Sequence, residues 1–232
     1  MNGSSLTREM KMKRQLFFGM TVVAVCLLFS PLATRAQSPE VKKWEVGVDF
    51  SSITFNAGKS EPGFGGRLTY NLNKHVALEA AGYFFPRKCQ FCAGQQNGRI
   101  SEGLFGVKAG KRFEKWGIFG KARPGFISFS DGKFNVVPIT VNPPTGVGAF
   151  PFEFVTNRLT TPAVDLGAVL EFYPTKRIVT RLDIGNTLIH YSPQTFNYLF
   201  IDATGKTVLG TSTTPAQNRG SLQIMAGVGF RF

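Results

Sequence analysis

The C-terminal end of the chain shows the clearest pattern of apolar and polar positions. From Leu222 to the final Phe232 every second residue is apolar, and the residues between them are Gln, Met, Gly, Gly and Arg. A period of two residues predicts a β-strand with one apolar face. Similar short alternating runs recur along the chain between turn signals, and helix signals are almost absent. The sequence therefore predicts a single all-β domain.

Eight such runs can be found, over residues 44–50, 64–72, 76–84, 101–109, 118–129, 163–172, 178–188 and 222–232. The first half of the fourth run is ambiguous, because Leu104 lies on its polar face. Short connections at 73–74, 113–116 and 174–176 alternate with long ones at 51–63, 86–100, 130–162 and 189–219. Part of 130–162 itself alternates around residues 142–146, so we expect the fifth and sixth strands to continue there as a hairpin.

The charged residues of these runs fall on one face. The apolar faces carry no Asp, Glu, Lys or Arg, whereas the opposite faces carry six acids and six bases: Glu45, Asp49, Glu79, Asp165, Glu171 and Asp183, with Arg67, Lys108, Lys121, Arg123, Arg181 and Arg231. A soluble barrel or sandwich with a polar exterior would show the same alternation. If the apolar face points outward instead, the charges fill a lumen just wide enough for side chains. Buried charges must be paired, so these twelve residues are then predicted to form an ion-pair network, in which Glu79 and Glu171 are candidate partners of Lys121 and Arg123.

The N-terminus decides between these two orientations. Lys11, Lys13 and Arg14 precede an apolar run over residues 16–29, and small residues at Thr34 and Ala36 suit a cleavage site. We interpret residues 1–36 as a secretory signal peptide and residues 37–232 as one barrel domain. Together with the short turns and long loops, this favours a barrel in the bacterial outer membrane, with periplasmic turns and extracellular loops.

Three segments carry a family resemblance: residues 70–79, 105–110 and 227–232. They resemble the small outer-membrane barrels of the OmpA/OmpX/OmpW type, over essentially the whole mature chain. The resemblance implies an eight-stranded antiparallel up-and-down transmembrane β-barrel and a monomer. Phe230 and Phe232 match the terminal signal that the barrel assembly machinery reads. The implied partners are that machinery, periplasmic chaperones, outer-membrane lipid and lipopolysaccharide.

Cys89 and Cys92 are the cysteine pair that remains after processing, and they lie in a predicted loop. A disulfide suits the oxidising periplasm, while a redox pair or half of a metal site are the alternatives. A zinc site needs about four ligands, and His75 and His190 are assigned to other places. We therefore expect no metal and no cofactor.

One cluster could carry catalysis. His190 and Ser192 share the parity of Leu188 and should face lipid, and they resemble the His-x-Ser of the outer-membrane lipid A deacylases. Pro193 stands where that family has Asn, and Asp202 is the only later carboxylate that could orient the histidine. A deacylase-like enzyme therefore ranks last among the expected functions.

The favoured function is non-enzymatic, in envelope integrity or surface interaction, with a largely closed lumen. The alternative is an OmpW-like narrow channel for small solutes, because one scaffold supports unrelated functions. Without residues 1–36 the chain keeps a net charge of +9, which suits anionic lipid head groups, and secretion argues against nucleic acid. The loop side is predicted to carry eight bases and five acids: Lys59, Arg87, Lys88, Arg99, Lys133, Arg158, Lys206 and Arg219, with Glu61, Glu102, Asp131, Glu153 and Asp202.

Overall fold

The computed structural model describes residues 42–55, 58–89, 97–138 and 152–232. Within them the chain forms ten β-strands, and none of the described segments is a helix long and apolar enough to cross a membrane. The strands are β1 (Trp44–Thr54), β2 (Ser60–Asn71), β3 (Val76–Cys89), β4 (Asn97–Arg112), β5 (Trp116–Pro138), β6 (Phe152–Phe172), β7 (Ile178–Tyr191), β8 (Gln194–Ile201), β9 (Thr207–Thr214) and β10 (Gln217–Arg231).

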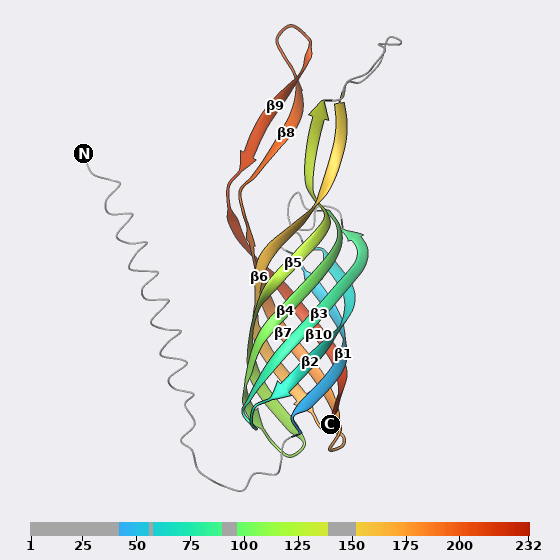
Figure 1. Cartoon of the computed structure of the whole chain (residues 1–232), viewed down its shortest axis with the longest axis vertical. Coiled ribbons are helices and arrows are strands. Elements are labelled where there is room, and N and C mark those ends of the chain that lie inside the picture. The colour runs from blue at the N-terminus through green and yellow to red at the C-terminus, as the bar shows by residue number, and fades with distance from the viewer. Residues whose placement is uncertain (1–41, 56–57, 90–96, 139–151) are drawn as a thin grey trace, which may run out of the picture. The chain divides into compact units, whose positions relative to one another are not determined.

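Eight of these strands close into an antiparallel barrel in the order β1-β10-β7-β6-β5-β4-β3-β2 (Figure 1). The terminal strand closes the ring, because β10 pairs with β1 in a register that places Val46 opposite Phe230. The three short connections lie at the end of the barrel where the chain terminates. The predicted fold class and the three tight turns are confirmed.

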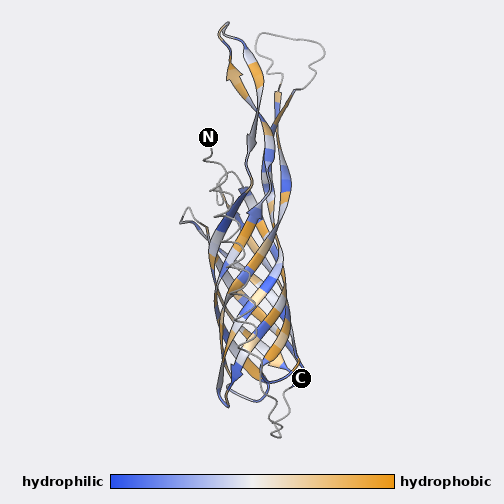
Figure 2. Cartoon of the chain, turned by 90° about the vertical axis from the view of Figure 1, so that its left-hand side faces the viewer, coloured by the Kyte–Doolittle hydropathy of each residue, from blue (hydrophilic) through white to orange (hydrophobic). Residues whose placement is uncertain are grey.

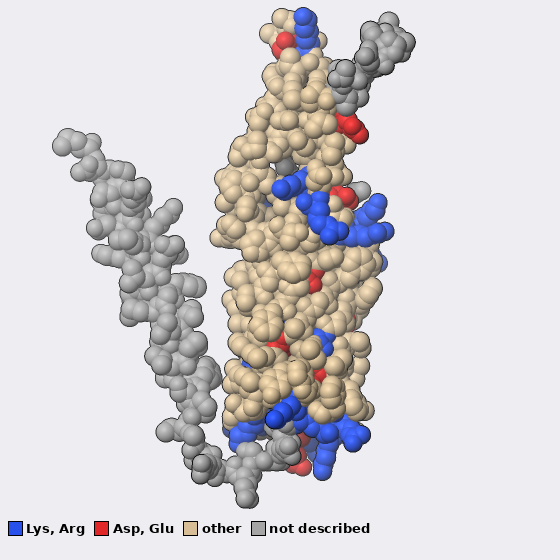
Figure 3. Space-filling view, viewed as in Figure 1, with Lys and Arg blue, Asp and Glu red and all other residues tan. Residues whose placement is uncertain are grey.

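The outer face of the barrel is apolar. Its strands turn every second side chain outward, and Val48, Phe105 and Ile184 are each more than half exposed. Orange residues follow the barrel strands in Figure 2. Figure 3 shows blue side chains gathered at the turn end and near the loop end, with a largely tan surface between. A closed barrel with an apolar outer band is suited to span a bilayer, since no strand edge remains unpaired.

The interior has two halves of different chemistry. The half nearer the turns holds charged side chains, while the half nearer the loops holds an apolar cluster built around Phe85, Ile100, Ile127 and Phe129. Leu104 belongs to this cluster and is 3% exposed, which resolves its apparent wrong parity. Near the loops the strands therefore alternate in the opposite sense, with apolar residues inward.

This inversion explains why one predicted loop was too long. Residues 51–63 were expected to form a loop, but β1 continues to Thr54 and β2 begins at Ser60. Ser51 and Ile53 point inward and are fully buried, while Ser52 and Thr54 are partly exposed. Polar residues outward and apolar ones inward are typical of a strand that has left the hydrocarbon region.

Two hairpins continue beyond the barrel. β5 and β6 pair from Lys133 opposite Asn157 to Pro138 opposite Phe152, after an irregularity that follows Phe129. This confirms the predicted extension, although its tip at residues 139–151 lies outside the described residues. The prediction that 189–219 is a loop was wrong, since it contains the two-stranded sheet β8–β9.

Side-chain amides link the two hairpins. The backbone N–H of Asn197 donates to Oδ1 of Asn135 at 2.9 Å, and the side-chain Nδ2 of Asn197 donates to the backbone carbonyl oxygen of Val136 at 3.2 Å. β8 therefore lies beside the extended part of β5, joined by side chains at this point.

Candidate functional site

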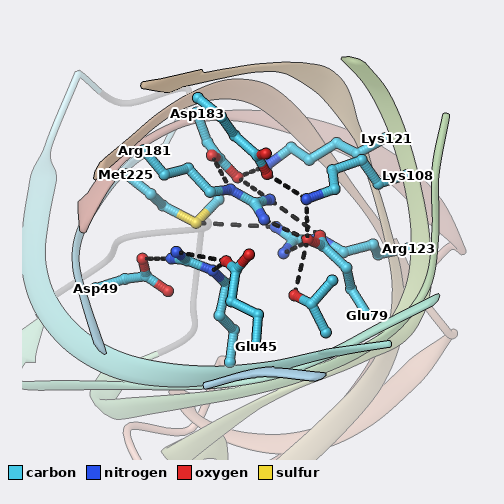
Figure 4. A network of polar contacts seen from close by, with 12 residues as sticks. Glu45, Asp49, Glu79, Lys108, Lys121, Arg123, Arg181, Asp183 and Met225 are labelled. Atoms are coloured by element: carbon cyan, nitrogen blue, oxygen red, sulfur yellow. Dashed lines mark hydrogen bonds and ion pairs between the residues drawn. The ribbon is translucent and has the colours of Figure 1, made fainter. Parts of the chain in front are cut away.

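The twelve charged residues predicted to face the lumen all lie inside the barrel. Each is at most 7% exposed, and each makes at least one ion pair. They come from all eight barrel strands, and the pairs link them into one continuous network, part of which is drawn in Figure 4. Every charge thus has a partner at a depth where an isolated charge would be very costly.

Glu79 on β3 is the centre of the network (Figure 4). Its carboxylate contacts Arg181, Lys108 at 3.3 Å and Arg123 at 3.7 Å, and it also accepts a hydrogen bond from Thr69 at 3.3 Å. These cations come from β7, β4 and β5, so one carboxylate joins strands on opposite sides of the lumen. Glu79 therefore links β3 to these three strands through ion pairs inside the lumen.

Two aspartates on the neighbouring strands β6 and β7 pair with the cations that lie next to Glu79. Asp165 receives two hydrogen bonds from Arg123, at 3.0 and 2.5 Å, and lies 2.9 Å from Nζ of Lys121. Asp183 contacts the same Lys121 at 3.2 Å and accepts two hydrogen bonds from Arg181, at 2.5 and 2.7 Å. The Arg181–Asp183 contact is bidentate, with one bond to each carboxylate oxygen, and such contacts fix geometry as well as charge. Both bonds from Arg123 go to Oδ2 of Asp165.

A second group of pairs lies at the turn end of the lumen. Arg231 on β10 donates to Glu45 at 2.8 Å and to Glu171 at 2.9 Å, and Glu45 also pairs with Arg67 at 3.2 Å. Lys108 reaches Glu171 as well. Glu171 was expected near Lys121 or Arg123, but its contacts are to other cations.

Sequence reasoning missed Arg112, which joins the same end. Its Nη2 lies 3.7 Å from Glu171, and its Nε donates to the Tyr173 hydroxyl at 3.1 Å. The guanidinium also lies over the Phe119 ring, 5.5 Å from its centroid. Arg112 lies four residues after Lys108 on β4, so the alternation of the strand predicts that both side chains face inward.

Glu102 was assigned to the extracellular loops, and that assignment was wrong. It lies inside the barrel, 3% exposed, where its Oε2 accepts a hydrogen bond from Gln223 at 2.8 Å. Gln223 also donates to Ser51 at 3.1 Å and accepts from Thr187 at 2.7 Å. These hydrogen-bonded polar side chains lie within the apolar cluster, since its members Leu104 and Met225 lie on the turn side of Glu102 and Gln223. Glu102 has the parity of Lys108, so the alternation had already placed it inward.

Two glycines leave space for charged side chains of the network. A Cβ atom at Gly227 would lie 1.9 Å from Oδ1 of Asp49, the carboxylate oxygen that Arg67 contacts. At Gly185 it would lie 2.6 Å from Oδ1 of Asp165 and 3.3 Å from Cε of Lys121. Inward-facing glycines on β10 and β7 thus leave the space that charged side chains fill.

Solved structures similar to this chain include small outer-membrane barrels. The attachment invasion locus protein Ail of Yersinia pestis is 11% identical, with 82% of this chain and 97% of that chain covered and a TM-score of 0.44. The N-terminal β-barrel domain of Pseudomonas aeruginosa OprF is 13% identical, with 81% of this chain and 97% of that chain covered and a TM-score of 0.41. Neisserial surface protein A is 12% identical, with 83% of this chain and 98% of that chain covered and a TM-score of 0.42.

The likeness concerns the general barrel arrangement, and the fold itself rests on the strand pairing described above. No protein-family model and no curated protein sequence matches the chain. The bacterial outer membrane predicted from the sequence is the setting that the closed barrel and its apolar belt fit.

The catalytic candidates are not brought together. His190 and Ser192 are exposed near the loop end of β7, as their parity predicted, and Nδ1 of His190 lies 2.7 Å from Oδ1 of Asn218. Asp202 lies at the far end of β8, where it accepts hydrogen bonds from Thr204 and Lys206. Eight strand residues separate it from the barrel, about 27 Å at the usual rise per residue. The group that contacts His190 is therefore an amide and not the expected carboxylate.

The remaining candidates lie at the strand ends. Cys89 ends β3, is buried and is disulfide-bonded, while Cys92 lies outside the described residues. Phe230 and Phe232 point outward, 48% and 58% exposed, at the seam between β10 and β1. The described residues contain no group of His, Cys, Asp and Glu that could hold a metal ion.

Proposed function

We propose that this protein is a non-enzymatic outer-membrane barrel with a closed lumen that holds two β-hairpins at the cell surface for interaction. The observation that carries this proposal is the filled interior. Glu79, Lys108, Arg123 and Asp165 are each 0% exposed, so no space for water adjoins their side chains. A conducting pore requires a continuous water column, which these residues interrupt.

The apolar cluster adds a second barrier toward the loops. Phe85, Ile100, Ile127 and Phe129 are also 0% exposed, and they come from β3, β4 and β5. A solute entering from the loop end would have to displace packed aromatic and aliphatic side chains before it reached the charges. Both barriers favour an anchor over a passive channel.

The hairpins supply the surface for interaction. Phe134 and Phe154 stack with ring centroids 5.6 Å apart on the β5–β6 hairpin. Tyr198 and Phe200 lie 5.9 Å apart on the β8–β9 hairpin, where both are more than 40% exposed. Exposed aromatic side chains of this kind are enriched where proteins bind partners.

Planar-bilayer recording on the refolded full chain tests the closed lumen. We expect only small or rare conductance events. A large, stable open state in the wild type would overturn the closed-barrel proposal in favour of the narrow-channel alternative.

Trypsin treatment of intact cells tests the display of the hairpins. Lys206 lies in the exposed tip between β8 and β9, whereas Lys176 and Arg177 lie in a short turn at the opposite end. Cleavage at Lys206 in intact cells, with cleavage at the turn only after permeabilisation, is the expected result. A Lys206→Gln variant is the matched control. Cleavage at the turn in intact cells would reverse the proposed orientation.

A further inference from the structure

Between the bases of the two hairpins lies a cavity of about 200 Å³. It is lined by residues 132–135 and Asn157 of the β5–β6 hairpin and by residues 193–196 before and within β8. Pairing between β4 and β5 ends at Asp131, so the cavity lies where the barrel wall stops and the hairpins begin. This is the rim of the barrel at its loop end.

The lining offers paired donors and acceptors. Asn157 and Gln194 each carry a side-chain amide, and within the described residues neither amide makes a hydrogen bond. Thr195 adds a hydroxyl, which is shared with Thr213 at 3.0 Å. An amide presents two donors and one acceptor oxygen, and a hydroxyl can do both, which complements groups that also donate and accept.

Two further features narrow the ligand chemistry. Phe196 on β8 is an aromatic residue among those lining the cavity, and an aromatic ring suits the C–H face of a small ring. Lys133 is the only charged residue among those lining it, and it pairs in register with Asn157 across the hairpin. An ammonium group donates only, so it selects an anionic substituent.

We propose that this cavity binds one sugar unit carrying a phosphate group, with Asn157 and Gln194 bonded to sugar hydroxyls and Lys133 paired with the phosphate. Its volume is below the range of about 300–1,000 Å³ typical of sites for drug-sized ligands, which fits a single ring better than a peptide or a nucleotide. The proposal rests on the proposed function only in that the hairpins face outward. Phosphorylated sugars at that height come either from the core of lipopolysaccharide or from free sugar phosphate.

Isothermal titration of the refolded full chain tests the site with four probes: deacylated lipopolysaccharide core oligosaccharide, glucose 6-phosphate, glucose and inorganic phosphate. We expect the phosphorylated sugars to bind at least tenfold more tightly than glucose or phosphate alone. Tighter binding of the core oligosaccharide than of glucose 6-phosphate would identify the membrane as the source, and the reverse would identify free sugar. Absence of binding by both phosphorylated sugars, or equal binding of phosphate alone, would overturn the proposal.

Variants separate the roles of the lining residues. Asn157→Ala with Gln194→Ala should weaken binding of every sugar probe by about tenfold or more, since each lost hydrogen bond to a sugar contributes. Lys133→Gln should weaken only the phosphorylated probes. Asn218→Ala, which removes an exposed amide outside the cavity, is the matched control and should bind as the wild type does. Unchanged binding in the double variant would place the sugar elsewhere and reject this site.

These outcomes are independent of the closed-lumen test. A conducting barrel could still bind sugar phosphate at the hairpin bases, and a closed barrel could fail to bind it. Heat-modifiable migration in gel electrophoresis confirms that each variant is folded. Binding of an unphosphorylated peptide in place of the sugars would reject the sugar site and indicate a peptide ligand.

Discussion

Lys108 and Lys121 stand directly opposite each other in the pairing of β4 with β5, and both are buried. Like charges in such positions repel. The two ammonium groups are held by different carboxylates: Lys108 by Glu79 and Glu171, and Lys121 by Asp165 and Asp183. These carboxylates belong to strands other than β4 and β5, so the β4–β5 ladder depends on the rest of the ring.

Replacing Glu79 by Gln should destabilise the barrel strongly. The change leaves Lys108, Arg123 and Arg181 short of one shared negative charge in a buried site. Loss of one partner from a buried pair typically costs about 3–5 kcal/mol. Urea unfolding in detergent measures this, with the exposed Glu153→Gln as control. A change below about 1 kcal/mol would show that the network is dispensable for stability.

A charge placed on the apolar outer band should destabilise the barrel about as much as the loss of a charge from the lumen. Leu182 points outward on β7 and is 49% exposed, between Leu170 and Ala226 on the neighbouring strands. Leu182→Arg should lower the free energy of unfolding in lipid by about 2–4 kcal/mol if the site lies near mid-bilayer. Leu209→Arg, on β9 beyond the barrel, should have little effect. Equal effects of both would contradict the membrane belt.

Deleting Phe232 should reduce insertion into the membrane. Its N–H donates to the carbonyl oxygen of Trp44 at 3.0 Å, so it is the last link of the β10–β1 seam. Pulse-labelled cells should accumulate protease-sensitive chain in the periplasm. Phe113→Ala, at an exposed turn of the same end, is the control and should insert normally. Normal insertion after the deletion would remove Phe232 from the assembly signal.

The tip of the β8–β9 hairpin should loosen in acid. Hydrogen bonds from the Thr204 hydroxyl and the Lys206 amide hold the pKa of Asp202 below its usual value of 3.8. Because the folded pKa is the lower one, the carboxylate stabilises the turn above about pH 3.8 and stops doing so as pH falls through the folded value. NMR titration of the Asp202 carboxyl carbon should give a midpoint below 3.8, and the Asp202→Asn variant should show no such transition. A midpoint above 3.8 would contradict the turn geometry.

The loop end should attract lipopolysaccharide phosphates. Glu61 was also assigned to the loops but is buried on β2, at 8% exposed. With Glu61 and Glu102 inside the barrel, the predicted loop set keeps eight bases against three acids, and Arg87, Lys88 and Arg99 are exposed there. Changing these three to Gln should reduce the lipopolysaccharide that co-purifies in mild detergent, because Arg holds phosphate bidentately. The matched control changes Lys111, Lys115 and Lys176, exposed bases at the turn end, to Gln. Equal loss in both variants would indicate charge without a preferred end.

The alternation of the strands predicted the barrel and the inward position of its charges, because a period of two assigns every residue to a face. It failed where the environment changed along a strand. Leu104 looked misplaced because the lumen turns apolar toward the loops, which a single sequence does not reveal. Glu102 was assigned to the loops for a different reason. The loop was taken to extend past it, although its parity with Lys108 already predicted an inward side chain.

Pairing partners were harder to predict than faces. Glu79 was expected near Arg123 and lies there, but Glu171 contacts Lys108, Arg112 and Arg231. Contacts across the lumen depend on the stagger between strands that are not neighbours in the sheet. The β8–β9 hairpin could have been found, since Phe196, Tyr198 and Phe200 alternate with smaller residues before a turn that contains Gly205 at φ +80°.

The length of the hairpins determines when they can be reached. β8 and β9 each add eight residues beyond the barrel, so the hairpin is about 27 Å long. If the hairpins face the cell surface, as proposed, a segment of that length would rise above a short saccharide layer and lie beneath a long polysaccharide coat. Access to its aromatic side chains would then depend on the coat of the cell, so that the same molecule would be exposed on a rough cell and masked on a smooth one.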